Sequence, residues 1–315
     1  MARACVFAPS PLLTVTIEPN RPDSGRHDGE GELHIHAGGQ GFWIARMVAA
    51  LGVDVVLCGT FGGETGEVLR SRIAADGVLL REIAAAGSNG AYVHDRRSGE
   101  RVEVAVMTPA TLSRHEVDEL YGATLVEALD SDVCVLGGPS DPGVLPPDVY
   151  RRLAADLRRN GTPVVADLSG EPLDAALEGG LDVVKVSHEE LLRDGRVASD
   201  DPEALLDAMY RLRDSGVGNV IVTRAEDPAL ALIDGEVLTI TPPRLDAVDE
   251  RGAGDSLTAG ITVAVARGES LASGLRVGAA AGALNVTRRG LATGKRDEIE
   301  RFAAHVEIGD DAPVG

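Results

Sequence analysis

Four short apolar runs decide the fold class: DVCVL (132–136), PVVAD (163–167), LDVVK (181–185) and NVIVT (219–223). Amphipathic stretches with helical spacing lie between these runs, at 148–159, 173–177, 188–193 and 202–213. Apolar runs that alternate with helices form a parallel sheet with helices on both faces. The sequence therefore predicts an α/β protein built on a doubly wound, mostly parallel sheet.

Two segments interrupt this alternation and indicate a small second sheet. Residues 91–107 alternate apolar and polar side chains on both sides of Arg97-Ser98-Gly99-Glu100, which is typical of a hairpin, and residues 13–17 and 33–35 alternate likewise. We assign these strands to a lid over the crevice of the core. The expected lid is 13–37 and 88–108, and the expected core is 1–12, 38–87 and 109–315. After residue 249 the chain is expected to be helical almost to its end, at 254–267, 270–288 and 296–304.

Composition excludes several classes of function. The 315 residues are 44% hydrophobic and 25% charged, with a formal net charge of -20, so a polyanionic partner such as nucleic acid is not expected. No apolar run is long enough to cross a bilayer, and residues 1–12 lack the pattern of a secretory signal, so we expect a cytoplasmic protein with no membrane partner. Cys5, Cys58 and Cys134 lie far apart in apolar runs, as reduced core thiols do.

The most informative stretch for chemistry is DERGAGDSLTAG (249–260), which joins a strand-like run to a helix of small residues. The turn Gly252-Ala253-Gly254 exposes backbone N–H groups at the positive end of the helix dipole, which forms an anion hole. Asp255 in the first helical turn is either a cap that complements the dipole or a base that takes a proton from an attacking hydroxyl. Spacing alone leaves both interpretations open. The small residues Gly260 and 278–283 predict close packing of helices.

A family resemblance rests on these residues and on a second motif. Gly252-Ala253-Gly254-Asp255-Ser256 with Thr258-Ala259-Gly260 resembles the C-terminal signature of the ribokinase-like, or PfkB, carbohydrate kinases, and GGQGFWIAR (38–46), with 50–52 and 59–66, resembles their N-terminal Gly-Gly signature. Further similarity at 167–170, 185–191 and 285–287 extends it over nearly the whole chain. The branch that it most resembles is that of the sugar-phosphate kinases, such as 1-phosphofructokinase and tagatose-6-phosphate kinase.

The resemblance implies a Rossmann-like core with a β lid, and ATP and Mg²⁺ as cofactors for phosphate transfer to an alcohol. We also expect a homodimer that forms through the lid. It makes Asp255 the catalytic base and Gly252, Ala253 and Gly254 the anion hole. The other implied roles are Lys185 near the ATP phosphates, Glu190 organising Mg²⁺ through water, and Ser187, Thr223, Arg251 and Asn285 at the nucleotide. The backbone at Asp249 is a candidate part of a monovalent-cation loop. The residues alone also allow plainer interpretations: a strand-end lysine for Lys185, a solvated helix residue for Glu190, and an ion pair of Arg251 with Glu250.

Departures from the family pattern concentrate on the acceptor side. Thr14 stands where the sugar-phosphate kinases carry an aspartate, Gln40 replaces the usual lysine, and Trp43 replaces the usual asparagine. A neutral amide removes a partner for an anionic substrate, while an indole offers a stacking face. The alternative interpretation of Trp43 is that its indole only packs at the start of an amphipathic helix. The expected substrate-binding residues are Thr14, Gly38, Gly39, Gln40, Trp43 and His36.

His34 and His36 alternate on one strand, so their rings face one side, as zinc ligands can, but no third ligand is evident. We expect the pair to line the substrate mouth or to lie on the lid surface.

The functional hypothesis is an ATP-dependent kinase for a hydroxyl of a sugar, sugar phosphate or related small molecule. The alternative, suggested by Thr14, Gln40, Trp43 and Ser187, is a catalytically degenerate relative that binds a nucleotide or sugar as a sensor. A dinucleotide-dependent oxidoreductase ranks last because the Gly-rich stretches lack a Gly-X-Gly-X-X-Gly turn after the first strand with an acidic residue about 20 positions on.

Overall fold

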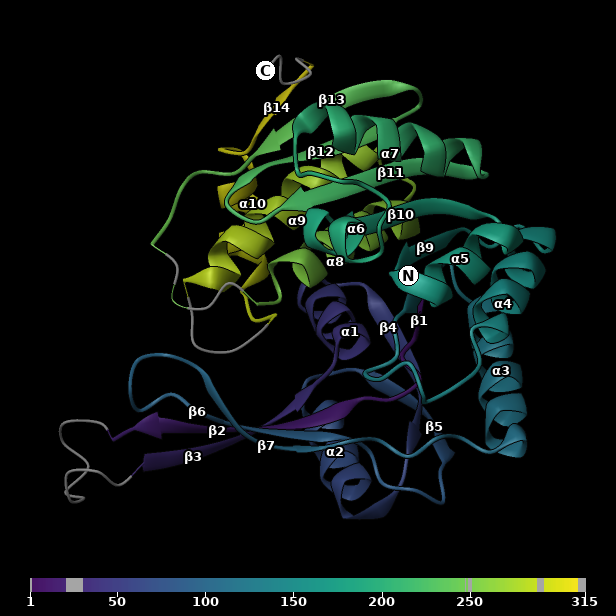
Figure 1. Cartoon of the computed structure of the whole chain (residues 1–315), viewed down its shortest axis with the longest axis vertical. Helices are drawn as coiled ribbons and strands as arrows, with labels where there is room; N and C mark the ends of the chain where they lie inside the picture. The colour runs from purple at the N-terminus through teal and green to yellow at the C-terminus, as the bar shows by residue number, and fades with distance from the viewer. Residues whose placement is uncertain (1, 21–30, 247, 249–250, 288–291, 311–315) are drawn as a thin grey trace.

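The computed structural model describes the chain except residues 1, 21–30, 247, 249–250, 288–291 and 311–315. It contains a ten-stranded sheet, a separate four-stranded sheet and ten helices among the described residues (Figure 1). The large sheet has the strand order β14-β13-β12-β11-β10-β9-β8-β1-β4-β5. Its strands are β1 (Arg3–Phe7), β4 (Asp54–Phe61), β5 (Leu79–Ala84), β8 (Val133–Gly137), β9 (Val164–Asp167), β10 (Leu181–Ser187), β11 (Val217–Arg224), β12 (Asp227–Ile233), β13 (Glu236–Thr241) and β14 (Glu307–Gly309).

The sheet is parallel from β5 through β11, as the alternation of strands and helices predicts. The remaining strands, β12, β13 and β14, extend it by antiparallel pairing. The helices are α1 (Gln40–Ala50), α2 (Gly63–Ala75), α3 (Arg114–Leu129), α4 (Asp148–Arg159), α5 (Gly170–Gly179), α6 (His188–Arg193), α7 (Pro202–Asp214), α8 (Ala253–Arg267), α9 (Leu271–Val286) and α10 (Arg296–Ala303).

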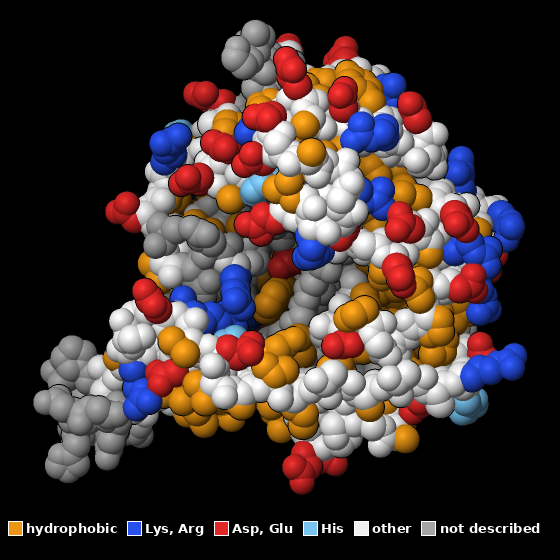
Figure 2. All heavy atoms as spheres, in the orientation of Figure 1, with side chains coloured by type: hydrophobic (Ala, Val, Ile, Leu, Met, Phe, Trp, Pro, Cys, Tyr) orange, Lys and Arg blue, Asp and Glu red, His pale blue; other side chains and the backbone are white. Residues whose placement is uncertain are grey.

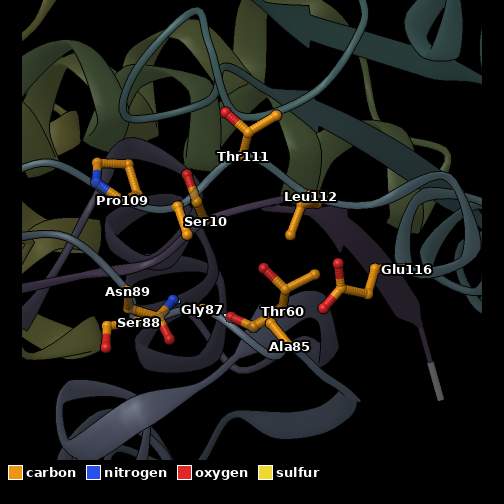
Figure 3. A pocket seen from close by; sticks show the side chains of 11 residues that line it. Ser10, Thr60, Ala85, Gly87, Ser88, Asn89, Pro109, Thr111, Leu112 and Glu116 are labelled. Carbon is orange, nitrogen blue, oxygen red and sulfur yellow. Dashed lines mark hydrogen bonds between the residues drawn. The ribbon is translucent and has the colours of Figure 1, made fainter.

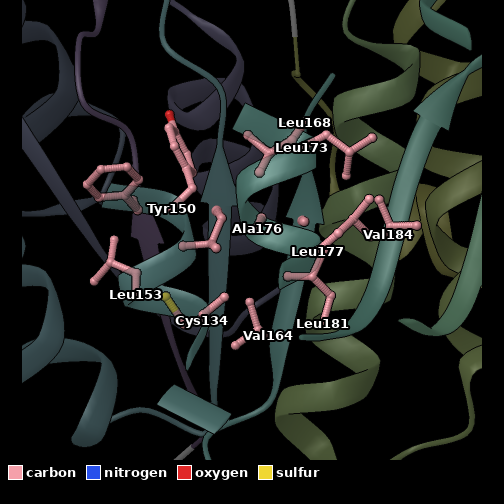
Figure 4. Close-up of a cluster of buried hydrophobic side chains, with 14 of the residues drawn as sticks. Cys134, Tyr150, Leu153, Val164, Leu168, Leu173, Ala176, Leu177, Leu181 and Val184 are labelled. Carbon is pink, nitrogen blue, oxygen red and sulfur yellow. The ribbon is translucent and has the colours of Figure 1, made fainter. Parts of the chain in front are cut away.

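Each face of the large sheet carries its own apolar core because successive side chains of a strand point to opposite faces. On β1, Cys5 and Phe7 belong to one buried cluster and Ala4 and Val6 to the other. Helices α3, α4, α5 and α7 cover the first face, part of which Figure 4 shows, and α1, α2, α8, α9 and α10 cover the second. The doubly wound α/β fold is therefore confirmed.

The small sheet is formed by β2 (Leu12–Pro19), β3 (Gly31–Gly38), β6 (Ala91–Asp95) and β7 (Val102–Met107), in the order β3-β2-β6-β7. It extends sideways from the lower part of the core (Figure 1). Two of its bounds, Leu12 and Gly38, lie one residue outside the expected lid segments. We call these four strands the lid.

The C-terminal part of the chain corrects one expectation. The predicted helices correspond to α8, α9 and α10, but the chain then returns to the large sheet as β14, which pairs with β13. The expected helix end at residue 288 lies outside the described residues, and α9 ends at Val286. Three residues of strand at 307–309 are too few to show a periodic pattern in the sequence.

The length and hydropathy of the helices decide whether any of them could cross a membrane. None of those in the described part of the chain combines the length and the hydropathy that a transmembrane span requires.

Candidate active site

The candidate site is built at the carboxyl ends of the parallel strands, where open α/β sheets bind their ligands. The strand register aligns Gly137 of β8 with Asp167 of β9, and Asp167 with Lys185 of β10. Ser187, two residues further on, is aligned with Thr223 of β11. Residues that the sequence assigned to the nucleotide side thus share one edge of the sheet.

Helix α8 begins at this edge with the predicted anion hole. Gly252 caps the helix with φ 76°, a left-handed conformation that favours glycine. A Cβ on Gly254 would lie 3.1 Å from Lys185 Nζ, so the ammonium group packs directly against the first turn of the helix. Asp255, in the same turn, is only 8% exposed. The structure therefore brings together Lys185, the anion hole and Asp255.

Close packing of α8 on α9 fixes the position of this turn. A Cβ on Gly260 would lie 2.4 Å from the Cα atom of Gly278, and one on Gly282 would lie 2.9 Å from the carbonyl oxygen of Ala253. The prediction that these small residues serve helix packing is confirmed.

A buried carboxylate, Asp167, connects the parts of the site. Lys185 Nζ donates a hydrogen bond of 2.8 Å and Gln40 Nε2 one of 2.7 Å to its Oδ1, while Thr258 Oγ1 donates one of 2.6 Å to its Oδ2. Asp167 has no exposed surface. Elements from opposite ends of the chain, α1, β10 and α8, therefore meet at one side chain.

Burial raises the pKa of Asp255 to about 8, with the nearby Asp167 raising it further, Lys185 lowering it and Glu190 raising it. Burial likewise raises the pKa of Asp167, although Lys185 opposes this. For Lys185, burial lowers the pKa, but the carboxylates of Asp167, Glu190 and Asp255 outweigh it and raise the pKa above its ordinary value. The arrangement keeps a cation at the anion hole and makes Asp255 a stronger base than an exposed aspartate.

A cavity of about 130 Å³ lies at the start of α1, beside the first loop and the end of β8. Figure 2 shows the wider hollow between the core and the lid, with acidic and basic side chains around it. Three predicted acceptor residues, Gly39, Gln40 and Trp43, line the cavity. The remaining lining residues are Ala8, Ser10, Pro11, Leu12, Gly41, Phe42, Gly138, Pro139 and Ser140.

The other predicted acceptor residues lie on the lid and do not line this cavity. Thr14 is 7% exposed, and its hydroxyl would lie 2.7 Å from a Cβ on Gly38, so a glycine is required there. His36 pairs with Thr14 across β2 and β3, and its ring stacks on that of His34 with 6.1 Å between centroids. Burial, with His34 and nearby arginines, lowers the pKa of His36. Among the described residues there is no group of three His, Cys, Asp or Glu side chains suited to a metal ion.

Ser187 and Glu190 form a capping box at the start of α6. Ser187 Oγ accepts a hydrogen bond from the Glu190 backbone N–H, and Glu190 Oε2 accepts one of 2.8 Å from the Ser187 backbone N–H. The carbonyl oxygen of Thr223 lies 3.2 Å from His188 Nδ1. Serine stands here where the family that the chain resembles carries asparagine, and the Ser187 side chain caps the N-terminus of α6.

Asn285 binds backbone groups in this structure. Its Nδ2 donates a hydrogen bond of 2.6 Å to the carbonyl oxygen of Arg251, its Oδ1 accepts one of 2.7 Å from the Ala292 backbone N–H, and the residue is 1% exposed. The side chain thus ties α9 to the segment before the anion hole, and its predicted contact with the nucleotide stays a prediction. Asp249 and Glu250 lie outside the described residues.

A smaller cavity, of about 10 Å³, lies where the lid joins the core (Figure 3). This is room for about one water molecule. Asn89, one of its lining residues, donates from Nδ2 to the carbonyl oxygens of Pro11 and Thr60 and accepts at Oδ1 from the Gly62 backbone N–H, each at 2.9 Å. Asn89 therefore fastens the root of the lid to the core.

Sequence reasoning assigned no role to Asp167, Thr258 or Asn89. Asp167 did carry a signal, because it is the polar residue that ends the apolar run 163–167, at the edge where ligands bind. The part that Asn89 plays depends on backbone groups of two separate segments, at residue 11 and at 60–62, which no local pattern in the sequence reveals.

The chain matches the model of the pfkB family carbohydrate kinases over residues 14–298. The chain belongs to the PfkB family. It is 32% identical over 313 residues to an ATP-dependent 6-phosphofructokinase isozyme 2 of Mycobacterium tuberculosis, covering 96% of this chain and 90% of the relative. It is 28% identical to a 1-phosphofructokinase of Haloferax volcanii, with 95% and 96% covered.

Solved structures agree with this assignment. A mutant of phosphofructokinase-2 from Escherichia coli matches with a TM-score of 0.85 and 26% identity, over 96% of this chain and 99% of that one. Arabidopsis thaliana ribokinase shares the fold, with a TM-score of 0.75 and 22% identity, over 96% and 99%. This PfkB protein is an ATP-dependent kinase that phosphorylates a hydroxyl of a sugar or related small molecule. The comparisons support this function over the degenerate sensor.

Proposed function

We propose that this PfkB kinase transfers phosphate to a sugar phosphate with Asp255 as its catalytic base. Asp255 takes the proton of the attacking hydroxyl, the Gly252-Ala253-Gly254 amides hold the charge that develops on the transferred phosphoryl group, and Lys185 adds a fixed cation beside them. The observation that supports this most strongly is the packing of Lys185 Nζ against Gly254 in the same helical turn that carries the buried Asp255.

ATP supplies the phosphoryl group, and Mg²⁺ is the metal that we expect with it. The protein offers no cage of three acidic or histidine ligands among its described residues, and Mg²⁺ is usually held by one or two carboxylates together with phosphates and water. Glu190 fits this role because only its Oε2 is committed to the capping box. Phosphofructokinase-2 from Escherichia coli has been solved in complex with potassium, so we extend the proposal to a monovalent cation near Asp249.

The proposed acceptor is a hexose phosphate of the kind that the relatives' names specify. Phosphofructokinase-2 from Escherichia coli, 26% identical over 96% of this chain, has been solved with fructose-6-phosphate. A second candidate is an unphosphorylated sugar, because Trp43 and the neutral Gln40 line the cavity at α1 and an indole binds the apolar face of a sugar ring.

We also propose a homodimer through the lid. The strand register places an almost wholly apolar set of side chains on one lid face, with Asp95 as its polar member. Three of these, Leu33, Val102 and Met107, are 62%, 50% and 40% exposed. The other members are Leu13, Val15, Ile17, Ile35, Ala37, Ala91, Val93 and Ala105. Ala37 and Leu13 pack against the core of the same chain, and the exposed remainder of this apolar face is typical of a surface that another chain covers. Phosphofructokinase-2 from Escherichia coli has been solved as a tetramer.

The test is ADP release from ATP and Mg²⁺ across a matched panel of fructose-6-phosphate, fructose-1-phosphate, tagatose-6-phosphate, fructose and ribose. We expect stoichiometric ADP and phosphorylated product, with kcat/KM highest for a sugar phosphate. Higher kcat/KM for an unphosphorylated sugar would favour the second candidate. Absence of turnover on every acceptor, with ATP bound, would contradict the proposed function.

A further inference from the structure

Gln40 faces the protein with both ends of its side-chain amide, although the sequence places it at the acceptor. Its Nε2 donates a hydrogen bond of 2.7 Å to Asp167 Oδ1, and its Oε1 accepts one of 3.0 Å from the Gly138 backbone N–H. The orientation of the amide follows from its partners, because an ionised carboxylate only accepts and a backbone N–H only donates. We propose that Gln40 is a positioning residue for phosphoryl transfer, acting through Asp167 and Lys185. This inference rests on the proposed function.

The hydrogen bond from Gln40 bears directly on Lys185 because both side chains donate to the same oxygen, Asp167 Oδ1. Asp167 is completely buried, and no water replaces a lost donor there without rearrangement. Thr258 holds the second oxygen, Oδ2. With all three donors present, the carboxylate has one orientation, and the Lys185 ammonium is held against Gly254 at the anion hole.

Glutamine suits this position better than the residues that could replace it. A lysine, the family's usual residue, would donate to Asp167 but leave the Gly138 N–H without its acceptor. A glutamate would accept from Gly138 but bring a second negative charge to Asp167. A leucine would do neither. Only an amide satisfies both neighbours at once, so the departure from the family pattern is compensated inside the site.

The test compares Gln40→Leu and Gln40→Lys with a control, Asn160→Leu, in steady-state kinetics. Asn160 carries an amide like that of Gln40 but lies exposed at the end of α4, where its Nδ2 donates a hydrogen bond of 2.7 Å to the carbonyl oxygen of Asp156, away from the carboxyl ends of the strands. We expect Gln40→Leu to lower kcat by on the order of 10-fold to 100-fold, with the KM values for ATP and acceptor changed less than about threefold, because a small displacement of a charged group costs about this much. Gln40→Lys should recover part of kcat. Asn160→Leu should leave kcat and both KM values nearly unaltered.

A double-mutant cycle identifies the route. If Gln40 acts through Asp167, Gln40→Leu should have much less effect on kcat in an Asp167→Asn background than in the wild type. Equal effects in both backgrounds, or a higher acceptor KM with kcat retained, would overturn the inference and return Gln40 to the acceptor. Circular dichroism and urea unfolding of the four proteins of the cycle, which are the wild type, the two single variants and the double variant, separate misfolding from a local effect. If the wild type turns over no acceptor, the proposed function fails, and the link between Gln40 and Asp167 is then decided by whether their unfolding free energies are coupled.

Discussion

Lys185 and Asp167 form a buried ion pair on adjacent strands, with 2.8 Å between Nζ and Oδ1 and side chains that are 6% and 0% exposed. Their strands, β10 and β9, pair in parallel with these two residues in register. The pair places a positive charge against the first turn of α8, where Asp255 and the anion hole lie. Its electrostatic consequences can be tested on stability as well as on activity.

Lys185→Met should destabilise the protein strongly and in a pH-dependent way. Removing one partner of a buried pair costs about 3–5 kcal/mol because the other charge stays buried. Without Lys185, burial raises the pKa of Asp167 further. A raised folded-state pKa means that stability is lost as pH rises, so the loss should be larger at pH 8 than at pH 5. Urea unfolding at both pH values measures this. The control, Lys295→Met, changes a side chain that is 82% exposed and should cost less than about 1 kcal/mol. A loss that is equal at both pH values would contradict the role of Asp167.

Asp255→Asn should stabilise the protein more at pH 8 than at pH 5. The pKa of Asp255 is raised by burial from 3.8 to about 8, so in that range the folded protein retains a proton that the unfolded chain releases. The stability lost as pH rises is removed when asparagine replaces the acid. We expect the gain in Tm at pH 8 to exceed that at pH 5 by about 2 °C or more in calorimetry. Asp118→Asn, on an exposed part of α3, is the control. A gain that does not depend on pH would mean that Asp255 is not in a desolvated site.

Gly254→Ala should lower kcat while the fold is kept. The new Cβ would lie 3.1 Å from Lys185 Nζ and 3.3 Å from Cε, and Lys185 cannot move away without weakening its bond to Asp167. We expect a loss on the order of 10-fold in kcat. Gly122→Ala is the matched control, since no atom lies within 4 Å of its Cβ, and in the middle of α3 it should stabilise the chain by about 0.5–1 kcal/mol without affecting turnover. Unchanged kcat in Gly254→Ala would place the ammonium group elsewhere during catalysis.

Leu33→Asp should disrupt the proposed dimer. Leu33 is 62% exposed on the apolar lid face, and a charge buried there in a dimer would lack a partner. Leu79→Asp is the control, because Leu79 is 61% exposed on β5, an edge strand of the large sheet that is not part of the apolar lid face. Sedimentation velocity should show a monomer for the first variant and the wild-type species for the second. A wild-type protein that is monomeric at micromolar concentration would refute the lid dimer.

Much of the fold could be predicted because local patterns determine it. The predicted helices 148–159 and 188–193 coincide with α4 and α6, whose amphipathic stretches begin at clear signals such as the capping box of Ser187 and Glu190. Strands β12 and β13 were not predicted, since 227–233 and 236–241 follow β11 without the intervening helix that marked the other strands. Antiparallel pairing at the sheet edge depends on contacts along β11 and not on a local period.

The site was predictable only in part for a similar reason. The anion hole and Asp255 lie in one contiguous motif, so their proximity follows from the chain itself. The network around Asp167 joins residues that are far apart in the sequence. Thr258 lies 91 positions after Asp167, and Gln40 lies 127 positions before it. Such convergence depends on how α1 and α8 pack against the large sheet, so the hydrogen bonds of Gln40 with Gly138 and Asp167 could not be predicted, while its acceptor role stays a prediction.

The central claim, that Asp255 removes the proton of the attacking hydroxyl, is tested most directly by the kinetics of Asp255→Asn with ATP affinity measured on the same preparation. Loss of a general base costs roughly 10²–10⁴-fold, so we expect kcat to fall by at least about 10²-fold while the calorimetric Kd for ATP changes less than about threefold. A variant that retains wild-type kcat with intact ATP binding would contradict the assignment of Asp255 as the base.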